Sequence, residues 1–181
     1  MISSHTRKTA DGALPLRFLR AIFSGMAQKS HYSYIMAGGG AAGLMLAYLL
    51  SFSDLSDFSA LVIDKEEKRK NDRTWSYWTR EPTEFDEIAH MVWRSIEFVG
   101  TDFEAVIDIS PYRYQTVRGK DFYDHVHKRL HEDSRVDFHY GEIGLVRDEG
   151  DRARVTVGEQ EFTADYVFDS LFLPRDFYVD T

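Results

Sequence analysis

A glycine-rich loop between two apolar segments constrains the fold of this chain more than any other feature. The loop reads Gly-Gly-Gly-Ala-Ala-Gly over 38–43, and it follows an apolar run that ends at Ala37. In a GxGxxG loop, the first glycine permits a tight turn, the second lets the backbone approach a pyrophosphate, and the third lets the helix pack closely on its strand. The pattern predicts that a dinucleotide contacts the loop residues, which are Gly38, Gly39, Gly40, Ala41, Ala42 and Gly43. The alternative is a glycine-rich turn that only packs a helix against a sheet.

An acidic residue follows this loop at the spacing of a dinucleotide-binding βαβ unit. The segment Leu61-Val62-Ile63 ends in Asp64, twenty-one positions after Gly43. At this place the second strand of such a unit delivers an acid to a ribose hydroxyl. Asp64 would repel a 2′-phosphate, so the site fits FAD or NAD better than NADP. The alternative reading of the glycines leaves Asp64 unexplained.

Composition excludes several classes of function. The 181 residues suffice for one domain, or for one domain and a piece of another. A net charge of -8 leaves no basic excess for nucleic-acid phosphates, and the lack of cysteine rules out disulfides, thiolate metal sites and thiol catalysis. No apolar run reaches the roughly 18 residues that span a membrane.

The pattern of apolar residues predicts an α/β fold of the Rossmann type with additional antiparallel strands. A strand from Tyr34 to Ala37, a helix from Ala42 to about Phe52 and a strand from Ala60 to Ile63 form a βαβ unit with a parallel sheet. The charged segment 64–73 is expected in solvent, and Trp75 to Trp78 in a buried or ligand-facing wall. Further strands are predicted at 93–99 and 103–109 (a hairpin with its turn at 100–102), 112–117, 136–140, 145–147, 154–157 and 161–168. A helix capped by Asp121 is predicted between the strands at 112–117 and 136–140.

Three histidines on the predicted helix that follows Asp121 raise the question of a metal site. His127 and His131 share one face, whereas His125 points away from it, and no carboxylate completes a tetrahedral set. We therefore expect exposed helix histidines and no metal.

The two ends of the chain read differently from its middle. Residues 1–30 are expected to be an extension outside the fold, with an interfacial anchor helix and a targeting segment as alternatives. At Phe177 to Thr181 neither a glycine or proline boundary nor a polar tail marks a finished domain. We therefore expect an FAD-binding domain over 31–181 that is C-terminally truncated and holds the first strands of a substrate region at about 75–117.

The stretch Asn71 to Trp75 resembles a known family. Together with Tyr32 to Ala47 and Leu61 to Asp64, it is similar to the flavin-binding lycopene cyclases of the beta-cyclase type. The pattern YxxVxGxDFYxxV, from Tyr114 to Val126, also looks like this family, as does the segment 164–170, where related flavoproteins return to the central sheet. The resemblance covers about residues 32–173.

The resemblance implies a non-redox reaction on a redox cofactor. These cyclases use reduced FAD, with NAD(P)H as reductant. An acidic side chain protonates an acyclic carotenoid such as lycopene, and the carbocation closes a β-ionone ring. The cofactor's phosphate or ribose edge would bind Arg73, for which a structural salt bridge is the alternative, and Arg118 would also contact the cofactor. The acid-rich motif of the family lies in its C-terminal half, so no catalytic acid is assigned here.

Further expectations follow from the same resemblance. The chain alone would lack cyclase activity and bind FAD weakly. We expect a cytoplasmic protein with peripheral contact to the inner membrane face, since its substrate is lipid-soluble. The alternatives are another FAD-dependent oxidoreductase or monooxygenase, or a non-catalytic remnant that needs a separate C-terminal half.

Overall fold

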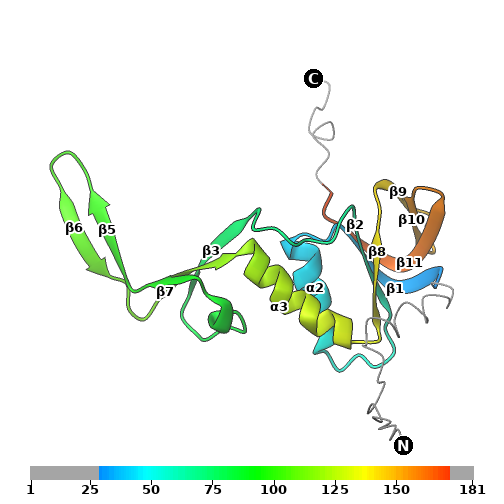
Figure 1. The fold of residues 1–181 in the computed structure, drawn as a ribbon, viewed down its shortest axis with the longest axis horizontal. Helices are drawn as coiled ribbons and strands as arrows, with labels where there is room; N and C mark the ends of the chain where they lie inside the picture. The colour runs from blue at the N-terminus through cyan, green and yellow to red at the C-terminus, as the bar shows by residue number, and fades with distance from the viewer. Residues whose placement is uncertain (1–28, 172–181) are drawn as a thin grey trace, which may run out of the picture.

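The computed structural model describes residues 29–171, which form a parallel-sheet core and an antiparallel arm (Figure 1). In chain order the elements are β1 (His31–Ala37), α2 (Ala41–Ser51), β2 (Ala60–Asp64), β3 (Thr74–Thr79), the 3-10 helix η1 (Asp86–Ile88), β4 (Met91–Trp93), β5 (Ser95–Val99), β6 (Glu104–Asp108), β7 (Arg113–Arg118), α3 (Gly119–Glu132), β8 (Val136–Tyr140), β9 (Ile143–Asp148), β10 (Ala153–Val157) and β11 (Gln160–Asp169).

The core is built on a six-stranded sheet with the order β8-β2-β1-β11-β10-β9. The strands β8, β2, β1 and β11 run parallel, and β10 and β9 continue the sheet in antiparallel fashion. The predicted βαβ unit with a parallel sheet is therefore confirmed, as are the strands predicted at 145–147, 154–157 and 161–168, which correspond to β9, β10 and β11. β11 lies directly beside β1, where it pairs Asp169 with Ala37.

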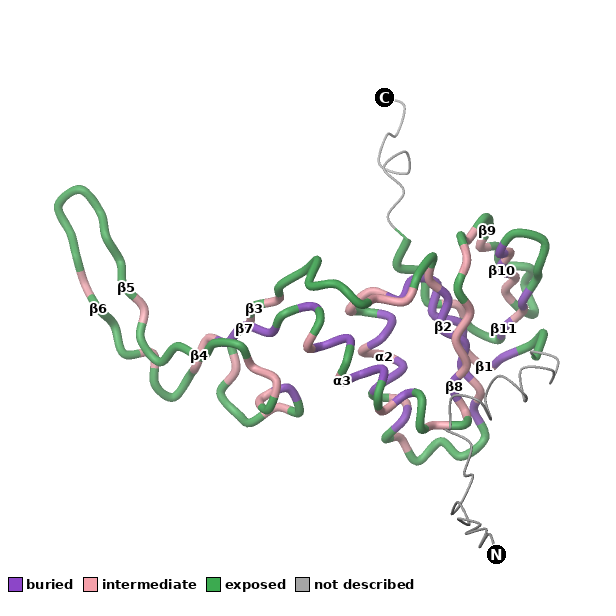
Figure 2. The backbone as a smooth tube through the Cα atoms, viewed as in Figure 1, coloured by how far each residue is buried: buried purple, intermediate pink, exposed green. Residues whose placement is uncertain are grey.

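Apolar side chains cover both faces of this sheet, which is why its central strands are almost continuously apolar. On one face, α2 and α3 lie side by side, and Met36 and Val62 pack beneath them (Figure 1). On the other face, Ile35, Leu61 and Ile63 pack with residues of β10 and β11. Full burial of such side chains contributes about 1.5–3 kcal/mol each. Figure 2 shows that buried residues concentrate in this core.

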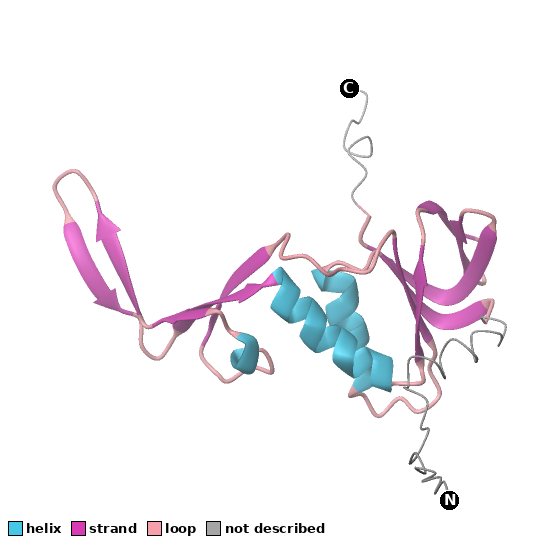
Figure 3. Ribbon diagram, in the orientation of Figure 1, coloured by secondary structure: helices cyan, strands magenta, loops and turns pink. Residues whose placement is uncertain are grey.

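The arm consists of two small antiparallel sheets beyond the helices (Figure 3). One has the order β3-β7-β4 and the other is the hairpin β5-β6. The predicted hairpin turn is confirmed, since the Gly100 amide donates to the Phe103 carbonyl at 2.7 Å. The predicted strand at 93–99 is divided, however. β4 ends at Trp93 and pairs with β7, whereas β5 begins at Ser95 and pairs with β6.

A polar network attaches η1 to the arm. The Arg113 guanidinium donates to Asp86 at 2.6 Å, and the buried Gln115 donates from Nε2 to the Tyr77 hydroxyl at 2.5 Å. Burial opposes ionisation of Asp86, but hydrogen bonds from Arg113, Thr83 and Gln115 outweigh it and lower the pKa of this carboxyl. The ion pair between Asp86 of η1 and Arg113 of β7 thus holds the loop that carries η1 against the arm.

The predicted helix cap at Asp121 is wrong. The N-cap residue is Arg118, whose backbone is extended, and α3 begins at Gly119. The Gly119 amide donates to the Arg73 carbonyl at 2.7 Å, so a contact distant in sequence fixes the start of the helix. Asp121 lies in the first turn and accepts a hydrogen bond from Arg118 Nε at 2.7 Å.

The expectation of exposed helix histidines is wrong for His127, which is only 9% exposed. Its ring packs against His131 and Phe138 at centroid distances of 5.6 and 5.1 Å. His131 is exposed, and His125, which is half-buried, hydrogen-bonds the Tyr48 hydroxyl at 3.0 Å. Over residues 29–171, no cluster of three histidine, aspartate or glutamate side chains is arranged to hold a metal ion.

Several expectations lie outside these residues. Residues 1–28 of the extension predicted at 1–30, and the chain end at Phe177 to Thr181, belong to segments that the structure does not describe. The division into domains stays a prediction. Within the described part of the chain, no helix combines the length and apolar character needed to cross a membrane.

Candidate functional site

The glycine loop stands at the carboxyl end of β1, and two of its glycines are required by the backbone. Gly38 adopts φ +114°, a conformation that side chains disfavour, and its amide donates to the Ile63 carbonyl at 2.9 Å. A Cβ at Gly43 would overlap the Gly38 carbonyl oxygen. These positions therefore make the tight turn and the close approach of α2 to β1 that the motif predicts.

The N-terminus of α2 follows directly from the glycine loop and is open. Its N-cap is Gly40, at which an added Cβ would meet no atom within 4 Å, and no side chain caps the described helix. The first turn holds Ala41, Ala42 and no acidic residue. Unpaired amides and the helix dipole at such an end attract phosphate groups.

Asp64 lies beside the glycine loop, at the end of β2 as predicted. Its Oδ2 accepts a hydrogen bond from the Gly39 amide at 2.8 Å. Its Oδ1 accepts from the Glu66 amide at 3.2 Å and lies 3.3 Å from Lys68 Nζ. A carboxylate offers roughly four acceptor positions, so one remains for a ribose hydroxyl. The ribose contact itself stays a prediction.

A hollow of about 920 Å³ opens at the carboxyl edge of the core sheet. Gly141, one of its lining residues, donates its amide to the Asp64 carbonyl at 2.9 Å. Asp169 and Leu171, which also line it, flank Ser170, whose Oγ donates to the Ala37 carbonyl at 3.1 Å. The lining residues are 139–146, 157, 158, 169 and 171. Ligands of open α/β sheets bind at this edge.

Tyr123 connects the start of α3 with the Asp72–Arg73 stretch. Burial raises the pKa of Tyr123 to about 12, and the charge of Asp72 and its hydrogen bond add to this. Asp64 raises the pKa further and Arg73 opposes it, so these groups lie within electrostatic reach of one ring. Sequence reasoning did not select Tyr123, although the DFYxxV pattern contains it. Arg73 is exposed, and the hydrogen bond between its neighbour Asp72 and Tyr123 holds this stretch beside the start of α3. The cofactor contact of Arg73 stays a prediction.

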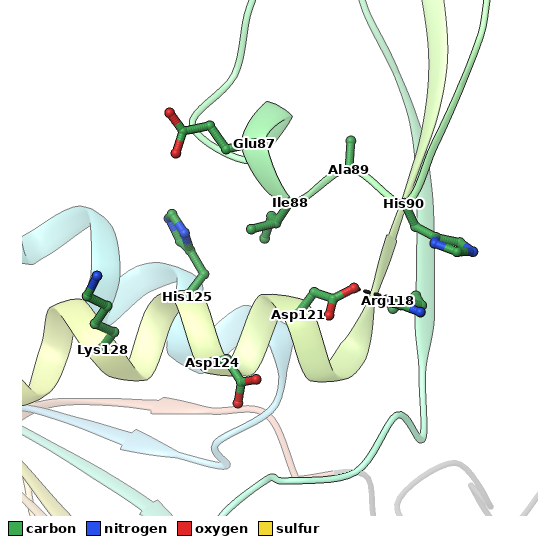
Figure 4. A pocket seen from close by; sticks show the side chains of 9 residues that line it. All are labelled: Glu87, Ile88, Ala89, His90, Arg118, Asp121, Asp124, His125 and Lys128. Carbon is green, nitrogen blue, oxygen red and sulfur yellow. Dashed lines mark hydrogen bonds and ion pairs between the residues drawn. The ribbon is translucent and has the colours of Figure 1, made fainter.

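Arg118 points elsewhere. Its side chain, paired with Asp121, lines a cleft of about 530 Å³ between η1 and α3, together with Glu87, Ile88, Ala89, His90, Asp124, His125 and Lys128 (Figure 4). Figure 4 shows Arg118 at one end of this cleft, away from Lys128. No lining residue belongs to the glycine loop. The structure shows the Arg118 guanidinium paired with Asp121 in this cleft, and its cofactor contact stays a prediction.

The fold matches known flavoproteins. PqsL, described as a probable FAD-dependent monooxygenase from Pseudomonas aeruginosa, matches with a TM-score of 0.60 at 15% identity, over 76% of this chain and 41% of that one. The flavin-dependent brominase Bmp2 matches with a TM-score of 0.55 at 19% identity, over 77% and 37%. The p-nitrophenol 4-monooxygenase PnpA from Pseudomonas putida DLL-E4 matches with a TM-score of 0.60 at 13% identity, over 77% and 40%. This chain therefore spans less than half of each of these structures.

The sequence comparison is more specific than the fold. No curated protein matches the chain. The family model described as lycopene cyclase protein matches residues 34–176, which contain the glycine loop, Asp64 and the Asp72–Trp75 stretch. This confirms the resemblance of about residues 32–173 to the lycopene cyclases. The chain belongs to the lycopene cyclase protein family.

Proposed function

We propose that this chain forms the nucleotide-binding part of an FAD-dependent lycopene beta-cyclase. The single observation that carries the proposal is the contact between the Gly39 amide and Asp64, because it joins the phosphate-binding loop to the ribose-binding acid. Membership of the lycopene cyclase family supports the choice of cofactor and reaction.

The residues present fit the dinucleotide part of FAD. A Cβ at Gly40 would point into open space, so a pyrophosphate has room above the amides of Ala41 and Ala42. Asp64 favours a free ribose hydroxyl over a 2′-phosphate, since two negative groups would repel each other. NAD(P)H as the reductant is part of the same proposal and rests on the family alone.

When bound in its reduced form, FAD supplies negative charge beside the cation formed on an acyclic carotenoid such as lycopene. The residues of this chain bind and orient the cofactor, and none is assigned as the acid that protonates the double bond. Ring closure leaves the substrate's oxidation state unchanged. A monooxygenase would instead consume oxygen and NAD(P)H in proportion to product, so oxygen uptake separates the two activities.

The lipid-soluble substrate also leads us to propose peripheral contact with a membrane. Flotation of the protein with phospholipid vesicles tests this contact independently of the cofactor.

FAD binding by the purified chain tests the cofactor assignment. We expect FAD to bind more tightly than NADP, and Asp64→Asn to weaken FAD binding by roughly 10- to 100-fold, the scale of a hydrogen bond to a charged group. Quenching of flavin fluorescence on titration measures FAD affinity, and displacement of bound FAD by NADP measures the affinity for NADP.

Asp102→Asn is the matched control, because Asp102 is an exposed carboxylate at the tip of the β5-β6 hairpin. It should bind FAD like the unmodified chain. Equal FAD affinity for Asp64→Asn and the unmodified chain, or tighter binding of NADP than of FAD, would overturn the assignment.

A further inference from the structure

The three-stranded sheet of the arm has one face that packs on the core. Along β3, alternate side chains point to opposite faces. Trp75 points to α3, with its ring 5.1 Å from Phe122 and 5.7 Å from Tyr123 between centroids. Tyr77 points the same way and accepts a hydrogen bond from the buried Gln115. The side chains of this face are therefore covered by contacts with α3 and within the arm.

The opposite face presents a row of aromatic rings. Trp78 of β3 lies 5.1 Å from Tyr114 of β7, and Tyr114 lies 5.8 Å from Trp93 of β4, between ring centroids. Trp78 is 52% exposed and Trp93 38%, and Met91 beside them is 47% exposed. Three neighbouring aromatic rings open to solvent on one sheet face are typical of a ligand surface. We call Trp78, Tyr114 and Trp93 the aromatic row.

The residues that strand pairing places next to the aromatic row on this face of β3, β7 and β4 are uncharged. Strand pairing places Ser76 and Thr116 next to the row, and their hydroxyls hydrogen-bond each other at 2.8 Å. The next pair, Thr74 and Arg118, begins β3 and ends β7. Arg118 thus carries the one charge that strand alternation places on this face of β3, β7 and β4. The next charged residues along the chain, Arg80 and Arg94, lie just beyond the ends of β3 and β4.

We propose that the aromatic row binds the conjugated chain of an uncharged acyclic polyene. This inference rests on the proposed function and assigns its substrate a surface. Flat π systems stack on aromatic rings, as single-stranded bases do on binding proteins, but nucleic acid also needs basic side chains. On this face β3, β7 and β4 hold one basic residue, Arg118, and the chain has a net charge of -8, so a neutral π ligand is the complementary occupant.

The position of the face supports this occupant. Its inner end, Thr74, directly follows Asp72 and Arg73, and the Arg73 carbonyl accepts the Gly119 amide at 2.7 Å. The face therefore continues from the stretch that adjoins the candidate cofactor site. A polyene on the row would lie across β3, β7 and β4, on the face that continues from that stretch.

A second copy of the chain is a poorer occupant. The row crosses three strands and is about 10 Å wide, whereas stable interfaces bury about 800 Å² on each partner. The neighbouring hairpin carries Glu97, Glu104 and Asp108, so a symmetric contact that also buried it would bring like charges together.

Visible circular dichroism of lycopene in detergent micelles tests the inference without cofactor, because an achiral polyene gains a signal only in a chiral site. We expect a signal with the unmodified chain. Trp78→Ala and Trp93→Ala should each weaken binding about tenfold, the scale of one aromatic stacking contact. Trp78→Phe keeps a ring and should restore most of the affinity.

Trp75→Phe is the matched control, because Trp75 lies on the opposite face of the same strand. It should leave the polyene signal unchanged, and far-ultraviolet circular dichroism checks that every variant is folded. A saturated isoprenoid of equal length should compete poorly.

Three results would overturn the inference: folded Trp78→Ala and Trp93→Ala that both bind lycopene like the unmodified chain, equal competition by the saturated isoprenoid, or a loss of dimer on sedimentation of Trp78→Ala with no loss of polyene binding. Asp64→Asn distinguishes the two proposals, since it should lose FAD affinity and keep the polyene signal. A chain that binds FAD but shows no polyene signal would leave the proposed function standing and overturn the aromatic row.

Discussion

Individual glycines of the loop have different roles, in packing or in ligand binding. Gly43 is required by packing, because an added Cβ would overlap a backbone oxygen that cannot move freely. Gly40 faces open space, so its lack of a side chain matters only when a ligand approaches. The same residue type therefore serves the fold at one position and the ligand at the other.

Gly43→Ala and Gly40→Ala should separate these duties. We expect Gly43→Ala to lower the free energy of unfolding by about 1–3 kcal/mol, the range for overpacked sites, and also to weaken FAD binding. Gly40→Ala should change the free energy of unfolding by less than about 0.5 kcal/mol and still weaken FAD binding. Urea denaturation and FAD titration measure both quantities. Equal stability losses in the two variants would contradict this division.

His127 should make the stability of the core depend on pH. Burial lowers its pKa, and His131 lowers it further, whereas Glu67, Asp124 and Asp64 act in the opposite direction. Neither ring nitrogen has a hydrogen-bond partner among the described residues. The folded protein thus holds the ring neutral, while the unfolded chain takes up a proton near pH 6.5. Stability is then fully present above about pH 6.5 and falls as the pH drops below it.

The variant His127→Leu tests this. It should remove most of the loss in the free energy of unfolding between pH 7.5 and 5.5, which one proton limits to about 1.4 kcal/mol per pH unit. Urea denaturation across this range measures the slope. His90→Leu, at an exposed position, is the control and should keep the slope of the unmodified chain. An unchanged slope in His127→Leu would assign the pH dependence to other groups.

At the scale of elements, β7 holds the arm together through polar contacts as well as strand pairing. Asp86→Asn removes the charge that faces Arg113, and both side chains are less than one third exposed. We expect Asp86→Asn to lower the free energy of unfolding by about 1–3 kcal/mol, which is less than the loss of a fully buried pair would cost. We also expect faster hydrogen exchange at the His90 amide, which donates to the Thr116 carbonyl at 2.8 Å. Glu87→Gln, at an exposed neighbour, should do neither. Slow exchange at His90 in Asp86→Asn would mean that other contacts hold η1 in place.

Elements defined by local chemistry were predictable from the sequence, and those defined by distant contacts were not. The strand, loop and helix around Gly38 follow from apolar runs and glycines, and the hairpin turn at Gly100 follows from alternation and a glycine. The start of α3 depends on Arg73, forty-six positions before Gly119, so the local signal at Asp121 misled. His127 was misjudged for the same reason, because Phe138 of β8 covers it. The separation of β4 from β5 depends on pairing with β7, which no local pattern records.

At the scale of the whole molecule, the candidate site divides in the same way. The sequence located the glycine loop and Asp64, because a motif with fixed spacing carries them. It grouped Arg118 with them, and that cofactor contact stays a prediction; the structure shows the guanidinium paired with Asp121 in the cleft between η1 and α3. The arm and the core meet at β3, β7 and α3, so a side chain of β7 can contact either the arm or the core. Which of the two it contacts depends on the three-dimensional path of the strand.

The return of β11 beside β1 has a consequence for how the molecule folds. Ser170 bonds to the Ala37 carbonyl across a separation of 133 residues, and its hydroxyl stands against Gly38. During synthesis, β1 and α2 leave the ribosome long before their parallel neighbour exists. The hydrogen bond from Ser170 next to the turn at Gly38 can therefore form only when nearly all of the described chain has emerged. Contacts of such long range slow folding. The hydrogen bonds from Gly38 to Ile63 and from Gly39 to Asp64 need only the next 25 residues, so β2 holds the glycine loop before β11 does.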